Sequence, residues 1–267
     1  MIQAVVAGIG GRMGSRIAQL VRDTEGIELA GGFEYSEHPC VGKDLSEAIG
    51  GGRTGKTVVG SMEEALHQAD LVIDFTSAAA SIQHLQLAAS KRIPMVVGST
   101  GFTPDQMAEA LELSSRCPCV ITPNMSIGVN ILFKVVADVA RMLGSDFDVE
   151  IVEAHHRFKK DAPSGTALKL AQIIAGSLSR KLDEVGVYAR HGLIGERSNE
   201  EIGIQTLRGG DIVGEHTVLF AGMGERIELT HRAHSRDNFA RGAVRAALWV
   251  IHQPPGLYDM ENVLGIK

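Results

Sequence analysis

The stretch "QAVVAGIGGRMGSRIAQLVRD", residues 3–23, decides the fold, because it joins a short apolar run to a helical pattern through a cluster of glycines. The apolar run, residues 4–7, has the composition of a buried strand. Apolar side chains then recur at helical spacing, at Met13, Ile17, Leu20 and Val21. Glycines at positions 8, 10, 11 and 14 permit backbone conformations and close approaches that a Cβ would block. We therefore predict a strand, a tight turn and a helix.

Such a turn suits a diphosphate, because the N–H groups and the dipole at a helix start attract negative charge. The spacing Gly8-x-Gly10-Gly11-x-x-Gly14 departs by one residue from the GxGxxG fingerprint of dinucleotide-binding proteins. A tight strand–helix turn without a ligand is therefore the alternative that this stretch leaves open.

A second strand, "IELAGGFE" (27–34), favours the dinucleotide. It ends in Glu34, twenty residues after Gly14, where an acid can bind the adenosine ribose hydroxyls. Tyr35 follows, at a place where an NADP site often carries Arg. A 2′-phosphate would be repelled by Glu34, so we expect NADH to be used at least as well as NADPH. Lys43 or Arg53 could fold back and weaken that preference.

Strands and helices continue to alternate. The runs "DLVIDFTS" (70–77), "PMVVGSTGF" (94–102) and "CVITPNMS" (119–126) are apolar and end in small polar residues. This pattern predicts a Rossmann-type, doubly wound parallel sheet, in which ligands bind beyond the carboxyl ends of the strands. The residues expected at that edge are Asp74, Thr76, Gly98, Ser99, Thr100 and Asn124.

The pattern changes near residue 127. A helix (127–144) and a strand (148–154) are followed by alternating runs at 216–222 and 225–233, which predict antiparallel strands. We expect a second α+β domain with a mixed or antiparallel sheet. The predicted domain limits are 1–126 with 236–267 for dinucleotide binding, and 127–235 for the second domain. A final helix from 237 is expected to return to the first domain.

The stretch "EAHHRFKKDAPSGTA" (153–167) concentrates positive charge. Five of the six residues 155–160 are His, Arg or Lys, and a helix with the cap-type residues Ser164 and Thr166 begins directly afterwards. Cations beside a helix start suit a carboxylate-bearing substrate. A solvated basic loop is the alternative.

The composition argues against several other classes. The net charge of −6 does not favour a nucleic-acid surface, and no apolar run approaches the length needed to span a bilayer. The N-terminus lacks the basic start of a signal peptide. Cys40, Cys117 and Cys119 lack zinc or thioredoxin spacing, so we expect no metal and a reduced, cytoplasmic setting. Ser164 has no evident triad partners. His191, His216 and His231 are expected at packing or surface positions.

Seven ordered motifs resemble those of the 4-hydroxy-tetrahydrodipicolinate reductase (dihydrodipicolinate reductase) family of lysine biosynthesis. They are "GIGGRMG" (8–14), "DFTS" (74–77), "GSTGF" (98–102), "TPNMSIGVN" (122–130), the 153–167 stretch, "RGGDIVGEHTV" (208–218) and "FARGAVRAALW" (239–249). The resemblance implies a homotetramer of two-domain subunits whose second domain binds substrate and mediates oligomerisation. It also implies NAD(P)H-dependent reduction of a cyclic imine dicarboxylate, with release of water, in diaminopimelate and lysine biosynthesis.

The resemblance also implies roles for individual residues. His155 matches the family's proton donor/acceptor and Lys159 its second donor. The substrate-carboxylate positions fall on His156, Gly165 and Thr166. The cofactor positions fall on Gly8, Ile9, Gly10, Gly11, Arg12 and Met13 for the diphosphate, on Glu34 for the ribose, and on Gly98, Ser99, Thr100, Thr122, Pro123, Asn124 and Met125 for the nicotinamide side. Tyr35 stands where many members carry Arg, and Ser77 stands where some members do, which weakens the case for a tight NADPH preference.

Two other functions remain open from the sequence. An NADH-binding redox sensor would need the glycine turn and Glu34 but not the His/Lys stretch. Another amino-acid dehydrogenase, for example one acting on aspartate, would share the cofactor fold. Oxidation of NADH in the presence of the cyclic imine substrate separates both from a reductase.

Overall fold

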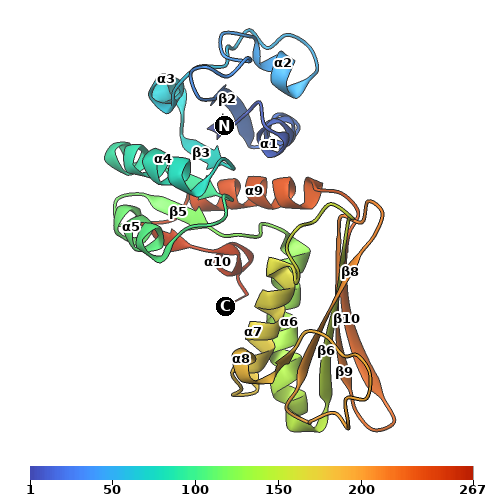
Figure 1. The fold of residues 1–267 in the computed structure, drawn as a ribbon. Helices are drawn as coiled ribbons and strands as arrows, with labels where there is room; N and C mark the ends of the chain where they lie inside the picture. Colours follow the sequence, from blue (N-terminus) through green and yellow to red (C-terminus); the bar gives the residue numbers. More distant parts are fainter. Residues whose placement is uncertain (267) are drawn as a thin grey trace. The chain divides into compact units, whose positions relative to one another are not determined.

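The computed structural model describes residues 1–266, and their contacts form two compact units (Figure 1). The first unit contains residues 1–127 together with the segment that starts at Asp237, and the second contains Gly128–Arg236. The chain therefore leaves the first unit once and returns to it near the C-terminus.

The first unit is built on a six-stranded sheet in the order β11-β5-β4-β3-β1-β2, in which all described pairings are parallel. The strands are β1 (Ile2–Ala7), β2 (Ile27–Phe33), β3 (Leu71–Asp74), β4 (Met95–Val97), β5 (Pro118–Ile121) and β11 (Gly256–Tyr258). This arrangement confirms the predicted Rossmann-type sheet.

Helices cover both faces of this sheet, as the alternation of strand side chains requires. Val6 and Ile73 belong to the core that contains residues of α1 and α9. Their neighbours Val5 and Val72 belong to a second core, with residues of α4 and α5. The helices are α1 (Arg12–Arg22), α4 (Ala78–Lys91), α5 (Pro104–Ser114) and α9 (Asp237–Val250), with the shorter α2 (Leu45–Ile49), α3 (Met62–Ala65), η1 (Leu66–Gln68) and α10 (Met260–Leu264).

Local chemistry explains where these helices begin. Thr103 and Gln106 form a capping box at the start of α5, with Pro104 at its first position, as the sequence predicts. Helix α1 begins after Gly11, whose position has no side chain to cap the helix. The first N–H groups of α1 therefore depend on other partners.

The second unit is a five-stranded mixed sheet in the order β10-β9-β6-β8-β7, which confirms the predicted α+β architecture. The strands are β6 (Asp148–His155), β7 (Gly186–Val187), β8 (Ile202–Arg208), β9 (Gly214–Ala221) and β10 (Arg226–Ala233). Strand β6 pairs antiparallel with β9 and parallel with β8.

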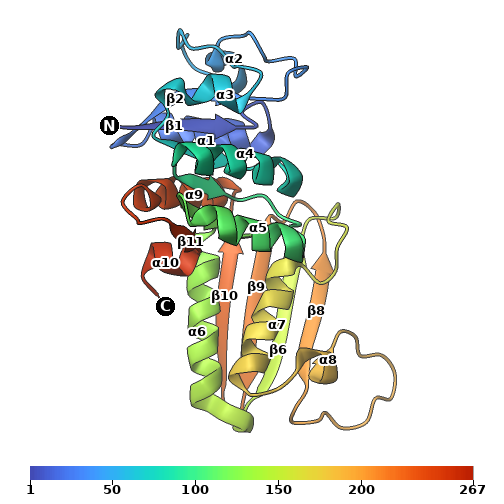
Figure 2. The same cartoon turned by 90° about the vertical axis from the view of Figure 1, so that its left-hand side faces the viewer.

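Two helices, α6 (Ile127–Leu143) and α7 (Gly165–Ser177), lie side by side on one face of this sheet (Figures 1 and 2). Val149 and Ile151 of β6 pack against Phe133 of α6 and Ile174 of α7 in the core. Residues 153 and 155 continue the same alternation, so their side chains lie on the helix-covered face, near the start of α7. The short helices α8 (Leu182–Val185) and η2 (Gly144–Asp146) complete the unit.

Candidate active site

A cavity of about 790 Å³ opens at the carboxyl ends of the first three strands. It is lined by residues that follow β1 (Gly8, Gly11), β2 (Glu34, Tyr35) and β3 (Phe75–Ser77). Strand β1 lies between β2 and β3, so the chain turns in opposite directions on its two sides. Parallel sheets bind ligands in the crevice at this kind of switch point.

The glycine turn has the geometry that its sequence predicts. Gly8 adopts a φ of +66°, which favours glycine. A Cβ on Gly14 would lie 2.0 Å from the carbonyl oxygen of Gly8, so helix α1 can pack against the turn only with glycine at this position. The backbone N–H of Gly10 donates to Glu34 Oε1 at 2.9 Å, which brings the predicted ribose-binding acid to the turn.

The surroundings of Glu34 include one residue that the sequence did not single out. His38 lines the same cavity and contacts the Tyr35 ring edge-on, with 5.2 Å between centroids. Lys43 and Arg53 instead lie within 4.0 Å of acidic partners in their own segment, Glu47 at 3.7 Å and Asp44 at 3.9 Å. The site thus presents Glu34 beside an exposed Tyr35.

Asp74 and Ser99, expected at the sheet edge, make internal hydrogen bonds. Asp74 is fully buried and accepts from Thr76 and from Nδ1 of His84, at 2.7 Å. Ser99 accepts from the Ser81 hydroxyl at 2.8 Å. Asp74 therefore helps to hold His84, which lines the cavity, rather than facing a ligand itself.

The other predicted cofactor residues lie in different settings. Ile9 and Met125 belong to the hydrophobic core, so only their backbone groups can face a ligand. Arg12 and Thr100 are exposed, Met13 and Gly98 are half-buried, and Pro123 is exposed. Thr122 is buried and donates to the Asn124 carbonyl at 3.3 Å. The segments 98–100 and 122–125 are not among the residues that line the 790 Å³ cavity.

In the second unit, β6 ends in two side chains that lie on one face and are bonded to each other. Glu153 is fully buried, and its Oε2 lies 2.6 Å from Nδ1 of His155. Arg208 donates to both oxygens of Glu153, at 2.8 and 2.9 Å. The backbone N–H of Ser164 donates to Oε1 at 2.9 Å. Three elements, β6, β8 and the start of α7, therefore meet at one carboxylate.

These contacts hold Glu153 in its charged form. Burial acts to raise the pKa of Glu153, but hydrogen bonds from His155, Arg208 and the Ser164 N–H outweigh it and lower the pKa to about 2. Glu153 thus carries its negative charge throughout the neutral range.

His216, on β9, lies against His155. The two rings meet edge-on with 5.2 Å between centroids, and His216 Nε2 lies 3.1 Å from Ser164 Oγ. Burial, followed by the influence of His155, lowers the pKa of His216 to about 3. His216 is therefore neutral and packs against His155, which agrees with the packing position expected from the sequence and places it beside the site.

The remaining members of the stretch surround the end of β6. Lys159 pairs with Asp161 at 2.8 Å, and its backbone N–H donates to the His156 carbonyl. The Nδ1 atom of His156 is buried and has no hydrogen-bond partner within residues 1–266. Gly165 begins α7, and a Cβ there would meet nothing within 4 Å. The start of α7 is thus accessible to a ligand, beside a histidine and a lysine of the same stretch.

Glu153, Arg208 and His216 are the residues that sequence reasoning missed. The signal for Glu153 was available, because residues two apart on a strand share a face, and Glu153 precedes His155 by two. Arg208 and His216 become neighbours only through strand pairing. Arg208 is opposite His155 in the β6–β8 register, and His216 is opposite Glu153 in the β6–β9 register.

No group of three or more His, Cys, Asp or Glu side chains within residues 1–266 is arranged to hold a metal ion. Over the same residues, no helix combines the length and the apolar character that crossing a bilayer requires.

The chain matches two family models, the N-terminus of dihydrodipicolinate reductase over residues 2–125 and its C-terminus over residues 128–264. Proteins named 4-hydroxy-tetrahydrodipicolinate reductase from Syntrophobacter fumaroxidans and Syntrophus aciditrophicus are 68% and 56% identical, each over the whole of both chains. A dipicolinate-bound dihydrodipicolinate reductase from Paenisporosarcina sp. TG-14 is 27% identical, has a TM-score of 0.77, and is matched over 98% of this chain and 99% of its own.

A more distant structure shares only the fold. An amine dehydrogenase from Mycobacterium smegmatis is 18% identical with a TM-score of 0.59, over 96% of this chain and 94% of its own. The family models, by contrast, cover both units almost completely, and the full-length relatives share more than half of their residues with this sequence. The chain belongs to the dihydrodipicolinate reductase family.

Proposed function

We propose that this chain catalyses the NAD(P)H-dependent reduction of 4-hydroxy-tetrahydrodipicolinate to tetrahydrodipicolinate, with release of water, in lysine and diaminopimelate biosynthesis. The observation that carries the proposal is the site around His155, which combines an oriented imidazole, a lysine and a helix start in a chain whose first unit has a glycine-turn cavity. A redox sensor would need only the cavity. The family membership favours the reductase over a dehydrogenase acting on aspartate.

His155 is proposed as the proton donor. NADH or NADPH, when bound, supplies the hydride. Hydride addition to a conjugated imine builds negative charge in the ring, and an acid close to that charge stabilises the transition state. His155 suits this task because an imidazole can both donate and accept a proton. Lys159 is proposed as the second donor, which holds positive charge near the ring or assists the loss of the hydroxyl group as water.

The substrate carboxylates are proposed to bind at the start of α7. Gly165 and Thr166 lie at the first two positions of the helix, where backbone N–H groups and the helix dipole favour an anion. The buried, unpartnered Nδ1 of His156 is available for a polar partner. The dipicolinate in the name of the Paenisporosarcina structure is a dicarboxylate, which supports this class of ligand. Anchoring the carboxylates fixes the orientation of the ring.

The dinucleotide is proposed to bind over residues 8–13, with its ribose at Glu34 and its nicotinamide side near 98–100 and 122–125. The positive φ of Gly8, the close approach at Gly14 and the bond from Gly10 to Glu34 all fit a diphosphate and a ribose. We propose that NADH is used at least as well as NADPH, because Glu34 repels a 2′-phosphate and Tyr35 offers it no cation.

Assembly and location are also proposals. We propose a cytoplasmic homotetramer formed through the second unit, which the sequence places at 127–235. The face of its sheet that lies away from α6 and α7 carries Leu207, which is 56% exposed, with half-buried Val152 and Leu219. A partner subunit could cover this surface. Cys40, Cys117 and Cys119 are free thiols, which suits a reducing compartment.

The test is an absorbance assay of NADH and NADPH oxidation, with the substrate generated in situ by dihydrodipicolinate synthase. Oxidation that requires the synthase and its substrates, with tetrahydrodipicolinate identified by mass spectrometry, is the expected result. NADH binding without oxidation would contradict the proposal and support a sensor. Oxidation with an aspartate-derived substrate alone would support the other dehydrogenase.

A further inference from the structure

We propose that Glu153 is a positioning residue for His155, and that it fixes which ring nitrogen exchanges protons with the substrate. The inference rests on the role of His155 proposed above. It concerns a fully buried carboxylate, Glu153, which would act on the substrate through the groups that it binds, the imidazole of His155 and the backbone N–H of Ser164.

Glu153 determines the tautomer of His155. His155 Nδ1 lies 2.6 Å from Glu153 Oε2, and an ionised carboxylate can only accept hydrogen bonds. Glu153 stays ionised because the bonds from His155, Arg208 and Ser164 outweigh its burial, with a pKa of about 2. Nδ1 must therefore carry its hydrogen. Nε2 is left as the nitrogen that takes up and releases the catalytic proton.

Glu153 also holds His155 in a fixed position relative to the start of α7. Glu153 Oε1 accepts from the backbone N–H of Ser164, the N-cap of α7, at 2.9 Å. The same carboxylate thus fixes the imidazole and the helix start at which the substrate carboxylate is proposed to bind. Their separation is set by one rigid group, and such preorganisation of acid and substrate is what positioning contributes to rate.

The negative charge of Glu153 stabilises the protonated form of His155. The groups that contact Glu153 and His155 are Arg208 from β8 and His216 from β9. In the loop before α7, Lys159 is paired with Asp161, whose backbone carbonyl accepts from Arg208, and the charge of Lys159 acts on His216. Arg208 binds Glu153 through two nitrogens and offsets its charge. Removal of the carboxylate would leave Arg208 and an imidazolium of His155 without the negative charge that both of them contact. Protonated His155 should then be disfavoured, and the alkaline limb of the kcat profile should move to lower pH.

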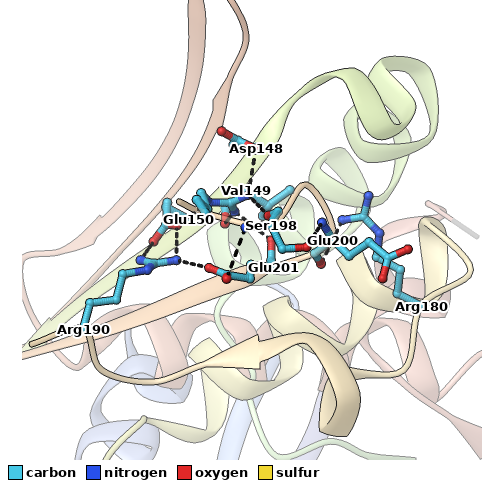
Figure 3. Close-up of polar contacts among 9 residues, drawn as sticks. Asp148, Val149, Glu150, Arg180, Arg190, Ser198, Glu200 and Glu201 are labelled. Carbon is cyan, nitrogen blue, oxygen red and sulfur yellow. Dashed lines mark hydrogen bonds and ion pairs between the residues drawn. The ribbon is translucent and has the colours of Figure 1, made fainter. Parts of the chain in front are cut away.

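Glu150 provides a matched control on the same strand. It pairs with Arg190, which also contacts Glu201, at 2.8 and 3.1 Å (Figure 3). Glu150 is three residues from Glu153, so it lies on the opposite face of β6. The variant E150Q therefore breaks a comparable ion-pair cluster that has no hydrogen bond to His155.

The experiment measures kcat, KM and Tm for E153Q, E153D, E150Q and H155Q across about pH 5–8, the range in which an unperturbed histidine side chain changes charge. We expect kcat of E153Q to fall at least ~10-fold with an unchanged KM for NADH, and its alkaline limb to move to lower pH. E153D retains the charge, but its side chain is one methylene shorter and cannot hold Nδ1 of His155 in the same place. Its kcat should therefore lie between those of E153Q and wild type, and its alkaline limb should lie closer to that of wild type. E150Q should lower Tm without changing kcat, KM or the pH profile.

The positioning role is overturned if E153Q keeps the kcat and pH profile of wild type, or if E153D and E153Q lose kcat equally with an unmoved limb. If E153Q does not fold, E153D decides, and wild-type kcat in E153D contradicts the proposal. The H155Q variant distinguishes a failure of the role proposed for His155 from a failure of the role proposed for Glu153. Full turnover in H155Q removes the proposed role of His155 itself, whereas a dead H155Q beside a normal E153Q removes only the role of Glu153.

Discussion

Glu34 Oε1 accepts a hydrogen bond from the backbone N–H of Gly10 at 2.9 Å, although the two residues lie on different strand–loop connections. The bond places a negative charge at the entrance of the glycine turn. Tyr35, next to it, is 62% exposed and offers no compensating cation. The choice between NADH and NADPH should therefore depend on the charge at positions 34 and 35.

The substitution Tyr35→Arg tests that dependence. A guanidinium at this position can pair with a 2′-phosphate through two hydrogen bonds, so kcat/KM for NADPH should rise roughly 10-fold relative to NADH. Tyr35→Phe, which adds no charge, serves as the control. Steady-state kinetics with both cofactors provide the measurement, and an unchanged ratio in Tyr35→Arg would show that the preference is set elsewhere.

Gly14 tests the packing of the glycine turn. A Cβ at this position would lie 2.0 Å from the Gly8 carbonyl oxygen, so Gly14→Ala must displace backbone. We expect a loss of roughly 2 kcal/mol or more in stability and weaker NADH binding, because overpacking strains the turn. Gly176→Ala, in α7 with nothing within 4 Å of its Cβ position, should be neutral or stabilising by up to ~1 kcal/mol. Thermal unfolding and NADH titration compare the two, and equal effects would contradict the packing argument.

His216 should make stability depend on pH above the range in which carboxylates titrate. Its pKa is lowered, mainly by burial, from 6.5 to about 3, so the folded form stays neutral while the unfolded chain takes up a proton. The contribution of neutral His216 to the free energy of unfolding is complete above pH 6.5. It is lost as the pH falls toward 3, by up to about 1.4 kcal/mol per pH unit. Glu153, with a pKa lowered from 4.5 to about 2, adds its loss only below pH 4.5.

The measurement is the unfolding midpoint of wild type and His216→Asn between pH 6.5 and 4.5, at one protein concentration. The variant should be less stable at neutral pH, because it loses the contact with Ser164, yet show a flatter decline. His191→Asn, an exposed histidine, is the control and should keep the wild-type slope. An identical slope in His216→Asn would assign the pH dependence to other groups.

The sequence predicted the first unit well because its signals are local. Apolar runs, glycine spacing and the Thr103 capping box each lie within one element and its neighbours, and the β-α-β order then limits the topology. Strand β11 was missed, since three half-buried residues give no periodic pattern. The sequence placed Asp74 at the edge of the sheet where ligands bind, but its carboxylate is hydrogen-bonded to His84. No pattern in the sequence indicates that pairing.

The site in the second unit was predicted only in part. His155, Lys159 and the Ser164 cap lie within one short stretch, so their association is a local property. Arg208 and His216 reach His155 through the registers of β6 with β8 and β9, which depend on contacts more than fifty residues apart. No pattern along a single strand specifies those registers.

Lys159→Met separates chemistry from binding. Lys159 keeps its ammonium group beside Asp161, and in the proposed site it holds positive charge near the substrate ring. If it is the second donor, kcat should fall by ~10²–10⁴, the usual range for a positioned acid. Steady-state kinetics of Lys159→Met provide the measurement, and a change confined to KM would make Lys159 a substrate-binding residue instead.

The most direct measurement is the turnover of His155→Gln beside its affinity for NADH. The account predicts that kcat falls by ~10²–10⁴ while NADH binds almost as in wild type, because His155 is not among the residues that line the glycine-turn cavity. His191→Gln, at an exposed histidine, should retain full activity. Near wild-type turnover in His155→Gln would contradict the account.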